Sequence, residues 1–86
     1  MEINWEDKAK NDFDKVIENL PQFHRTIAKV LVKAKAEQLA KNRNSETVQN
    51  EDLIKAFFAE VPPAFKEMMK RLLNQYNINY TEYIDE

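Results

Sequence analysis

His24 is the single histidine of the chain and, by residue type, the best candidate for a general base or a metal ligand. No second ligand stands at metal-binding spacing from it, and the pattern offers no nearby nucleophile. The chain contains no cysteine, which excludes disulfides, thiolate-bound zinc and iron–sulfur clusters. It contains no glycine either, which excludes a glycine-rich phosphate loop. We therefore predict that His24 is an ordinary polar residue in the first turn of a helix.

Carboxylates are plentiful, but their spacing does not bring them together. Asp12 and Asp14 are two residues apart on an expected helix, so their side chains point in different directions. Acid–base catalysis by two carboxylates requires that they converge in a cleft. The sequence therefore predicts a protein that is not an enzyme and that uses no cofactor or metal.

Basic side chains form a line along the longest expected helix. Arg25, Lys29 and Lys33 are each four residues apart, and Lys41 and Arg43 extend the line past the end of that helix. Such a line suits an anionic partner, either nucleic acid or an acidic protein face, but it also fits a solvated stripe. The chain as a whole has a net charge of −2, and few aromatic residues interleave the basic ones. We therefore expect nucleic acid to be the less favoured partner.

A second candidate surface lies on the last expected helix. Its apolar residues recur at three- and four-residue spacing and include adjacent methionines, whose flexible side chains suit docking surfaces. This possible docking stripe consists of Phe65, Met68, Met69 and Leu72. A four-helix chain must also bury such a stripe somewhere, so packing against the rest of the domain is the favoured interpretation.

Four helices are expected to position these residues. The first is expected at about 5–19 with Asn4 as its N-cap, and the second at about 21–42 with Pro21 at its first position. The third is expected to run from an Asn50 cap to the break at Pro62, and the fourth covers about 63–76. Thr47-Val48 forms a short extended link before the third helix. The prediction is an all-α fold: one compact four-helix domain over residues 1–86 with a long central helix.

The central helix carries apolar residues on more than one stripe, so we expect it to pack on two sides. Leu31 is placed in that core, where Leu31→Asp would prevent folding by burying an unpaired charge. Trp5 is expected to pack against the same helix. Asparagine adopts the left-handed conformation at helix ends more readily than most residues, and we expect helices to stop at Asn19, Asn42, Asn44 and Asn77.

The ends of the chain indicate a cytoplasmic protein without membrane contact. No apolar run approaches the ~18 residues of a membrane span. The first six residues lack the basic-then-apolar pattern of a signal peptide. The tail from Ile78 to Ile84 alternates weakly and is expected to lie extended or to fray.

A spaced pattern of residues runs through the first two-thirds of the chain. It consists of Trp5, Ala9, Leu20-Pro21-Gln22-Phe23-His24-Arg25, Ala28, Val32, Ala36, Ala40, Thr47-Val48, Glu51-Asp52-Leu53 and Ala56. Over residues 4–57 this pattern resembles the small helical domain (PCP_red-like) at the C-terminus of the B subunit of light-independent protochlorophyllide reductase. The resemblance implies an appended accessory module rather than the catalytic core, and it carries over no catalytic residue. The added helix and tail, residues 62–86, lie outside it.

The middle of the chain also looks like the second half of an archaeal-type histone fold. The stretch 35–41, followed by Thr47-Val48 and Glu51-Asp52-Leu53, has the same order of long helix, short strand and capped helix. Histones are strongly basic, whereas this chain is mildly acidic. The leading hypothesis is therefore a non-catalytic helical module that binds a protein partner. The alternative is a histone-fold-like or other small nucleic-acid-binding protein that uses Arg25, Lys29, Lys33, Lys41 and Arg43.

Overall fold

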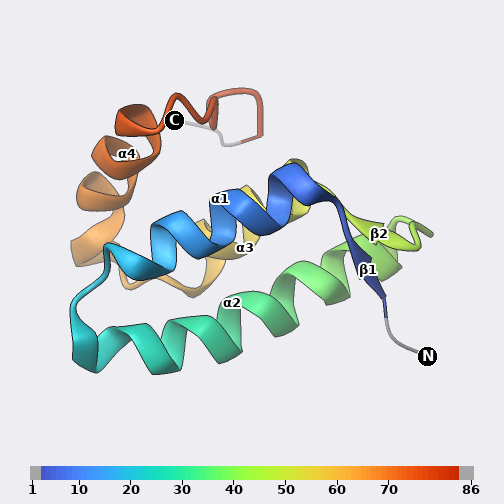
Figure 1. Ribbon diagram of the computed structural model, residues 1–86, viewed down its shortest axis with the longest axis horizontal. Helices are drawn as coiled ribbons and strands as arrows, with labels where there is room; N and C mark the ends of the chain where they lie inside the picture. Colours follow the sequence, from blue (N-terminus) through green and yellow to red (C-terminus); the bar gives the residue numbers. More distant parts are fainter. Residues whose placement is uncertain (1–2, 84–86) are drawn as a thin grey trace.

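The computed structural model describes residues 3–83. Within them lie four α-helices, two short strands and one 3-10 turn, namely β1 (Asn4–Trp5), α1 (Asp7–Glu18), α2 (Gln22–Asn42), β2 (Thr47–Val48), α3 (Asn50–Glu60), η1 (Pro63–Phe65) and α4 (Lys66–Gln75). Helices α1 and α2 run in opposite directions, with the strand pair at one end of the molecule and α4 above the other end (Figure 1). The predicted all-α fold with a long second helix is confirmed.

The segment before α1 differs from the prediction. Asn4, predicted as an N-cap, lies in β1, which pairs in parallel with β2. The N–H of Asn4 donates to the carbonyl of Glu46 at 3.1 Å, and the N–H of Glu6 donates to the carbonyl of Val48 at 3.0 Å. The predicted extended link at Thr47-Val48 is confirmed. Its pairing with β1 joins segments distant in sequence, so a local capping pattern could not reveal it.

The asparagines at helix ends follow the prediction in part. Asn44 and Asn77 have φ angles of 61° and 59°, so both take the left-handed conformation that ends a helix without glycine. Helices also stop where predicted at Asn19, the C-cap of α1, and at Asn42, the last residue of α2. Neither takes the left-handed conformation, and the φ of Asn19 is −93°. Pro21 is the N-cap of α2 rather than its first helical residue.

The core forms where α3 packs against α2 and α1. Helix α2 faces it with Val32, Ala36 and Ala40. Because small side chains at four-residue spacing let two helix axes approach closely, α3 can fill the contact with larger residues. The buried apolar side chains of α3, α4 and the segment after it are Leu53, Ile54, Ala56, Phe57, Phe58, Met69, Leu72, Leu73 and Ile78.

Helix α2 packs on one side only, which corrects the prediction of two-sided packing. Its opposite side carries the large exposed apolar residues found within residues 3–83. They are Phe23, Ile27, Val30 and Leu31, with exposed fractions of 73%, 58%, 63% and 44%. The assignment of Leu31 to the core is therefore wrong, and so is the expectation that Leu31→Asp prevents folding, because an aspartate there would remain in contact with water.

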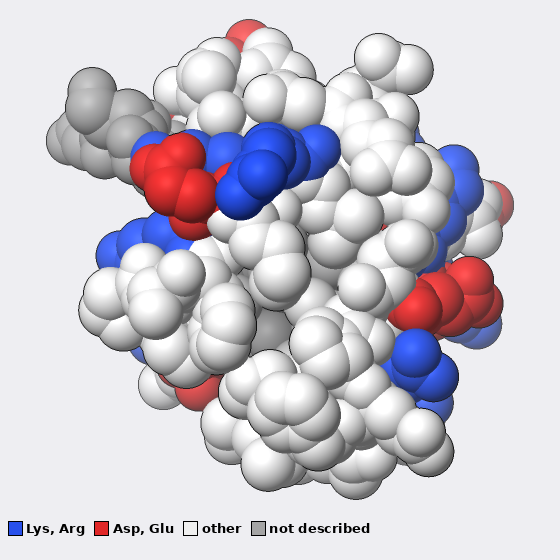
Figure 2. Space-filling view, turned by 90° about the vertical axis from the view of Figure 1, so that its left-hand side faces the viewer, with Lys and Arg blue, Asp and Glu red and all other residues white. Residues whose placement is uncertain are grey.

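The reason lies in the arrangement of the helices. Helix α3 and the paired strands cover the Val32 side of α2, while α4 stands at the end of the molecule and leaves the other side open (Figure 1). Apolar periodicity shows that a face is apolar, but it does not show whether another element covers it. The end that combines the α1–α2 link with α4 is largely uncharged over the lower and central parts of Figure 2, while charged side chains lie across its upper part and at its sides.

The segment after α4 is packed rather than frayed as far as the structure describes it. Ile78 is 3% exposed, and Tyr80 and Tyr83 pack against the core. The Tyr80 ring lies against Phe58, with ring centroids 5.8 Å apart. Burial raises the pKa of the Tyr83 phenol above its usual value. The end of the predicted tail, Ile84, lies outside the described residues.

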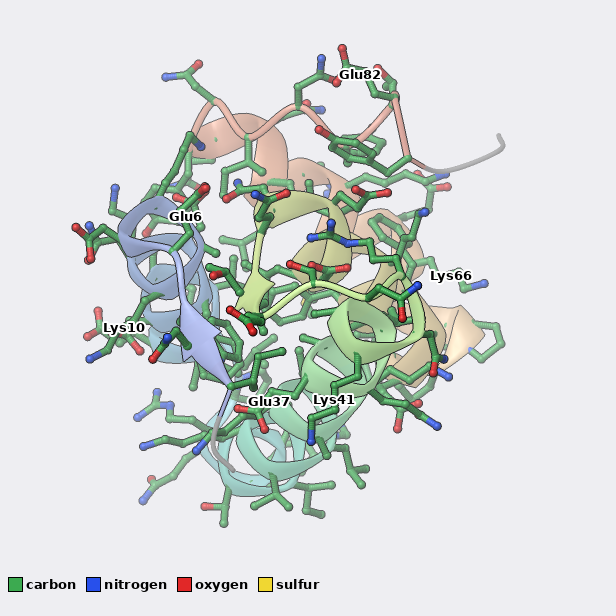
Figure 3. The ribbon with its side chains drawn as sticks, turned by 90° about the vertical axis from the view of Figure 1, so that its right-hand side faces the viewer. Glu6, Lys10, Glu37, Lys41, Lys66 and Glu82 are labelled. Carbon is green, nitrogen blue, oxygen red and sulfur yellow. The ribbon has the colours of Figure 1, made fainter. Side chains whose placement is uncertain are left out.

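Trp5 connects β1 to the helices by two kinds of contact. Its ring packs against Phe13 of α1, with centroids 5.2 Å apart. Its indole Nε1–H donates to Oε2 of Glu37 at 2.9 Å. Glu37 lies on α2 close to β1 (Figure 3). The expected contact between Trp5 and the central helix is therefore present, but the residue belongs to a strand and is only half-buried.

Two substitutions separate these contacts. Trp5→Phe keeps an aromatic ring and removes the hydrogen bond to Glu37, and we expect a loss of about 1 kcal/mol in the free energy of unfolding. Trp5→Ala also removes the ring, and we expect a loss of about 2–3 kcal/mol, below the ~3–5 kcal/mol of a fully buried aromatic residue. Urea unfolding followed by far-UV circular dichroism measures both. Equal midpoints for the two variants would show that the ring packing contributes nothing.

Candidate protein-docking surface

The predicted basic line does not remain one surface. The Nη2 group of Arg25 donates to the backbone carbonyls of Glu18 and Leu20, each at 3.2 Å. Arg25 therefore joins the start of α2 to the end of α1. Lys29 and Lys33 are exposed on α2, and so is Lys41 near its end. The part of the line that remains available to a partner is formed by these lysines.

Arg43 holds the start of α3. Its Nε and Nη2 donate to the two carboxylate oxygens of Asp52 at 2.9 and 2.7 Å, a bidentate ion pair. Asp52 is 1% exposed and also accepts the backbone N–H of Gln49 at 3.0 Å. Gln49, and not the predicted Asn50, is the N-cap of α3. The hydrogen bond to Asp52 raises the pKa of the Arg43 guanidinium. Arg43 thus fixes the link between α2 and α3.

The predicted docking stripe of α4 is divided between the core and the surface. Met69 is 0% and Leu72 is 9% exposed, so both belong to the core. Phe65 and Met68 are half-buried and line an apolar groove. Core packing, the favoured interpretation of the stripe, therefore describes Met69 and Leu72. Of the four stripe residues, only Phe65 and Met68 are open to a partner.

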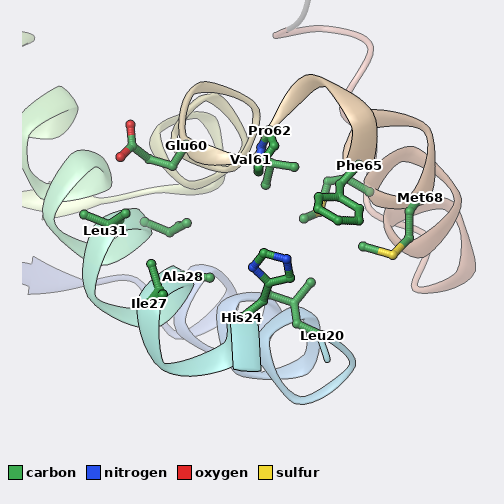
Figure 4. Close-up of a pocket in the computed structure, with 12 residues that line it drawn as sticks. Leu20, His24, Ile27, Ala28, Leu31, Glu60, Val61, Pro62, Phe65 and Met68 are labelled. Atoms are coloured by element: carbon green, nitrogen blue, oxygen red, sulfur yellow. The ribbon is translucent and has the colours of Figure 1, made fainter. Parts of the chain in front are cut away.

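This groove has a volume of about 260 Å³. One wall belongs to α2 and the other to the segment from the end of α3 to the start of α4 (Figure 4). Its principal apolar side chains are Leu20, Ile27, Leu31, Val61, Pro62, Phe65 and Met68. The groove is hydrophobic on both walls, and Glu60 lies at its rim with the carboxylate directed away from the centre (Figure 4).

His24 lies in this groove as an aromatic packing residue. Its ring centroid is 4.4 Å from that of Phe23 and 5.0 Å from that of Phe65, the second contact being edge-on. It is half-buried, and its imidazole lies beside the Phe65 ring in the groove (Figure 4). The predicted place of His24 in the first turn of α2 is confirmed, and its surroundings are those of a packing residue rather than of a metal ligand.

The exposed apolar residues of α2 were not predicted as a site. We call Phe23, Ile27, Val30 and Leu31 the outer face of α2. Their positions i, i+4, i+7 and i+8 place them in one row on a helix. Ile27 and Leu31 also line the groove, so the row and the groove form one continuous apolar surface. The signal in the sequence was the excess of apolar residues on α2, which we interpreted as a second packing contact.

The carboxylates diverge as predicted. Asp12 is 6% exposed and accepts hydrogen bonds from Nζ of Lys8 at 3.0 Å and from Nδ2 of Asn50 at 2.7 Å. Asp14 points to solvent. Within residues 3–83, no group of three or more His, Cys, Asp or Glu side chains is placed to hold a metal ion. None of the helices in this range has both the length and the hydrophobicity of a membrane span.

The architecture is that of a small all-α protein whose longest helix carries an open apolar face. The chain belongs to the family described as "Protein of unknown function (DUF2621)", whose model matches residues 1–85. Neither the curated proteins nor the solved structures include a significant match to it. The family match covers the added C-terminal helix together with the rest of the chain, and it assigns no activity. The resemblance to the reductase-appended domain stays a prediction.

Proposed function

We propose that this protein is a non-catalytic helical module that binds another protein through the outer face of α2 and the adjoining groove. The observation that carries the proposal is a row of four large apolar side chains, between 44% and 73% exposed, on the longest helix. Monomeric proteins rarely expose contiguous apolar patches of this kind, and such patches mark interaction sites. The groove adds a concave apolar recess, where a partner's side chain would be anchored.

An accessory role in the cytoplasm, as expected from the resemblance to the reductase-appended domain, is part of this proposal. It is supported by how the polar residues are used. Arg25, Arg43 and His24 make contacts within the domain, and the surface left for a partner is apolar rather than reactive. Nucleic-acid binding, the alternative, is supported only by the exposed lysines of α2, since both arginines of the basic line are engaged within the chain.

Site-specific photo-crosslinking in cells tests the proposal. A benzophenone amino acid in place of Phe23 is expected to form an adduct with one protein. The same amino acid in place of Asn74, which is exposed on α4, serves as the control and is expected to form none. Adding Leu31→Asp to the protein that carries benzophenone at position 23 should reduce the adduct about 10- to 100-fold, corresponding to about 1.4–2.8 kcal/mol of binding free energy.

Three results would contradict the proposal. The first is an adduct that forms equally from both positions, which would indicate non-specific contact. The second is the absence of a protein adduct at position 23. The third is an adduct at position 23 that persists in the Leu31→Asp variant. An adduct with nucleic acid instead of protein would favour the alternative. Far-UV circular dichroism of each variant establishes that the helices are retained.

A further inference from the structure

We infer that the partner segment bound by the outer face and the groove is an acidic amphipathic helix. The inference rests on the proposed function and adds to it the secondary structure and the charge of the partner. Shape argues for the helix, and the distribution of charge on α2 argues for acidic residues.

The shape of the surface fits a helix laid along α2. The α2 helix has 21 residues and is therefore about 32 Å long at ~1.5 Å per residue. The outer face forms a ridge along its first half, and the groove runs beside this ridge between Ile27, Leu31 and the Phe65–Met68 segment (Figure 4). A partner helix presents apolar side chains at the same i, i+4 and i+7 spacing. One of these side chains can enter the groove while the neighbouring ones pack against the ridge.

The charge of α2 is strongly positive. The helix contains five basic side chains, Arg25, Lys29, Lys33, Lys35 and Lys41, and one carboxylate, Glu37. Glu37 accepts the indole N–H of Trp5. The ~3.6-residue helical repeat gives the positions of the lysines around α2. Lys33 and Lys35 lie on opposite flanks of the outer face. Lys41 lies in line with Phe23, farther along the helix. A partner with acidic residues beside its apolar stripe is complementary to this arrangement.

The carboxylates near the surface do not reverse this balance. Asp14 and Glu18 of α1 line a shallow hollow together with Arg25, Lys29 and Val30 of α2. Glu60 lies at the rim of the groove with its carboxylate directed away from the centre (Figure 4). The net positive charge is therefore greatest around the second half of α2, and the acidic residues of the partner are expected there.

Two other occupants fit less well. A second copy of this chain would bring two positive α2 helices together, and like charges across an interface disfavour association. An anionic bilayer would attract the lysines, but a flat surface leaves the concave groove unfilled. An acidic amphipathic helix both complements the positive charge of α2 and fills the groove with an apolar side chain.

Designed peptides test the inference directly. The first is an amphipathic peptide of about 18 residues with leucines on one face and glutamates on the other, and the second has lysine in place of every glutamate. Fluorescence anisotropy of each labelled peptide gives its Kd for the full chain. We expect the acidic peptide to bind at least about tenfold more tightly, or about 1.4 kcal/mol, with the difference diminishing at about 0.5 M salt.

Three variants locate the effect. Lys33→Glu with Lys41→Glu, at two exposed positions in the second half of α2, is expected to remove the preference for the acidic peptide. Lys10→Glu with Arg71→Glu makes the same change in charge on α1 and α4, at exposed positions, and should preserve it. Ile27→Asp is expected to abolish binding of both peptides.

The outcomes distinguish this inference from the proposed function. Equal or tighter binding of the lysine peptide, with loss in Ile27→Asp, would overturn the acidic partner and leave apolar docking intact. A dimer in sedimentation equilibrium that Ile27→Asp dissociates would assign the surface to a second copy. Binding to phosphatidylglycerol vesicles but to neither peptide would assign it to a membrane. If both peptides still bind the Ile27→Asp variant, the outer face and the groove are not the binding site, and the proposed function is contradicted.

Discussion

Val32→Asp is expected to prevent folding. Val32 is 1% exposed and lies on the side of α2 that packs against α3. A carboxylate at this position would have no cation within the core, and an unpaired buried charge costs several kcal/mol or more. That is comparable to the whole free energy of unfolding expected for a domain of this size, ~5–10 kcal/mol. Far-UV circular dichroism and a thermal melt measure the result.

The neighbouring residue provides the matched control. Leu31→Asp makes the same chemical change one position earlier, where the parent side chain is 44% exposed. Because water still reaches that position, we expect the free energy of unfolding to change by only about 1 kcal/mol. A cooperative melt of Val32→Asp near that of the parent would mean that α2 buries a different face. Unfolding of both variants would mean that the outer face is covered.

Arg43→Met has the second largest expected effect. It removes the cation from Asp52, which is 1% exposed and then retains only the N–H of Gln49 as a described donor. Breaking a buried ion pair by removing one partner costs ~3–5 kcal/mol. The Arg43 side chain is 33% exposed, so water can take part of its place, and we expect a loss of about 3 kcal/mol in the free energy of unfolding. Urea unfolding measures it.

Two further variants show whether the ion pair is the cause. Lys33→Met removes one positive charge from the exposed part of the basic line and is expected to change stability by less than about 0.5 kcal/mol. Asp52→Asn added to Arg43→Met removes the buried charge and should recover part of the loss. If Arg43→Met and Lys33→Met have the same midpoint, Arg43 does not have the structural role assigned to it.

Features that depend on neighbouring residues could be predicted from the sequence. Apolar residues at three- and four-residue spacing indicated α1 and α4, and Pro62 separated α3 from the segment that follows. Asn44 and Asn77 end helices in a chain without glycine because asparagine tolerates the left-handed conformation. The divergence of Asp12 and Asp14 follows from helix geometry alone.

Features that depend on distant residues could not be predicted in this way. Asn4 has the side chain of a good N-cap, but pairing with β2 places it in a strand. Arg43 looked like the end of a basic surface line, and only the approach of α3 brings Asp52 to it. Met68 and Met69 are adjacent in one stripe, yet Met69 is buried and Met68 lines the groove, because the position of α4 decides which side is covered.

The outer face of α2, which we propose as the binding surface, also depends partly on local sequence and partly on tertiary structure. The sequence determined that α2 is a long helix with apolar residues on more than one side and with lysines beside them, since residue type and the ~3.6-residue repeat suffice for that. The tertiary structure determined which side is buried. Helix α3 covers Val32, Ala36 and Ala40, and the side that carries Phe23 and Ile27 stays open. Burial depends on the placement of all the helices together, because each face is covered or exposed by elements far away in the chain.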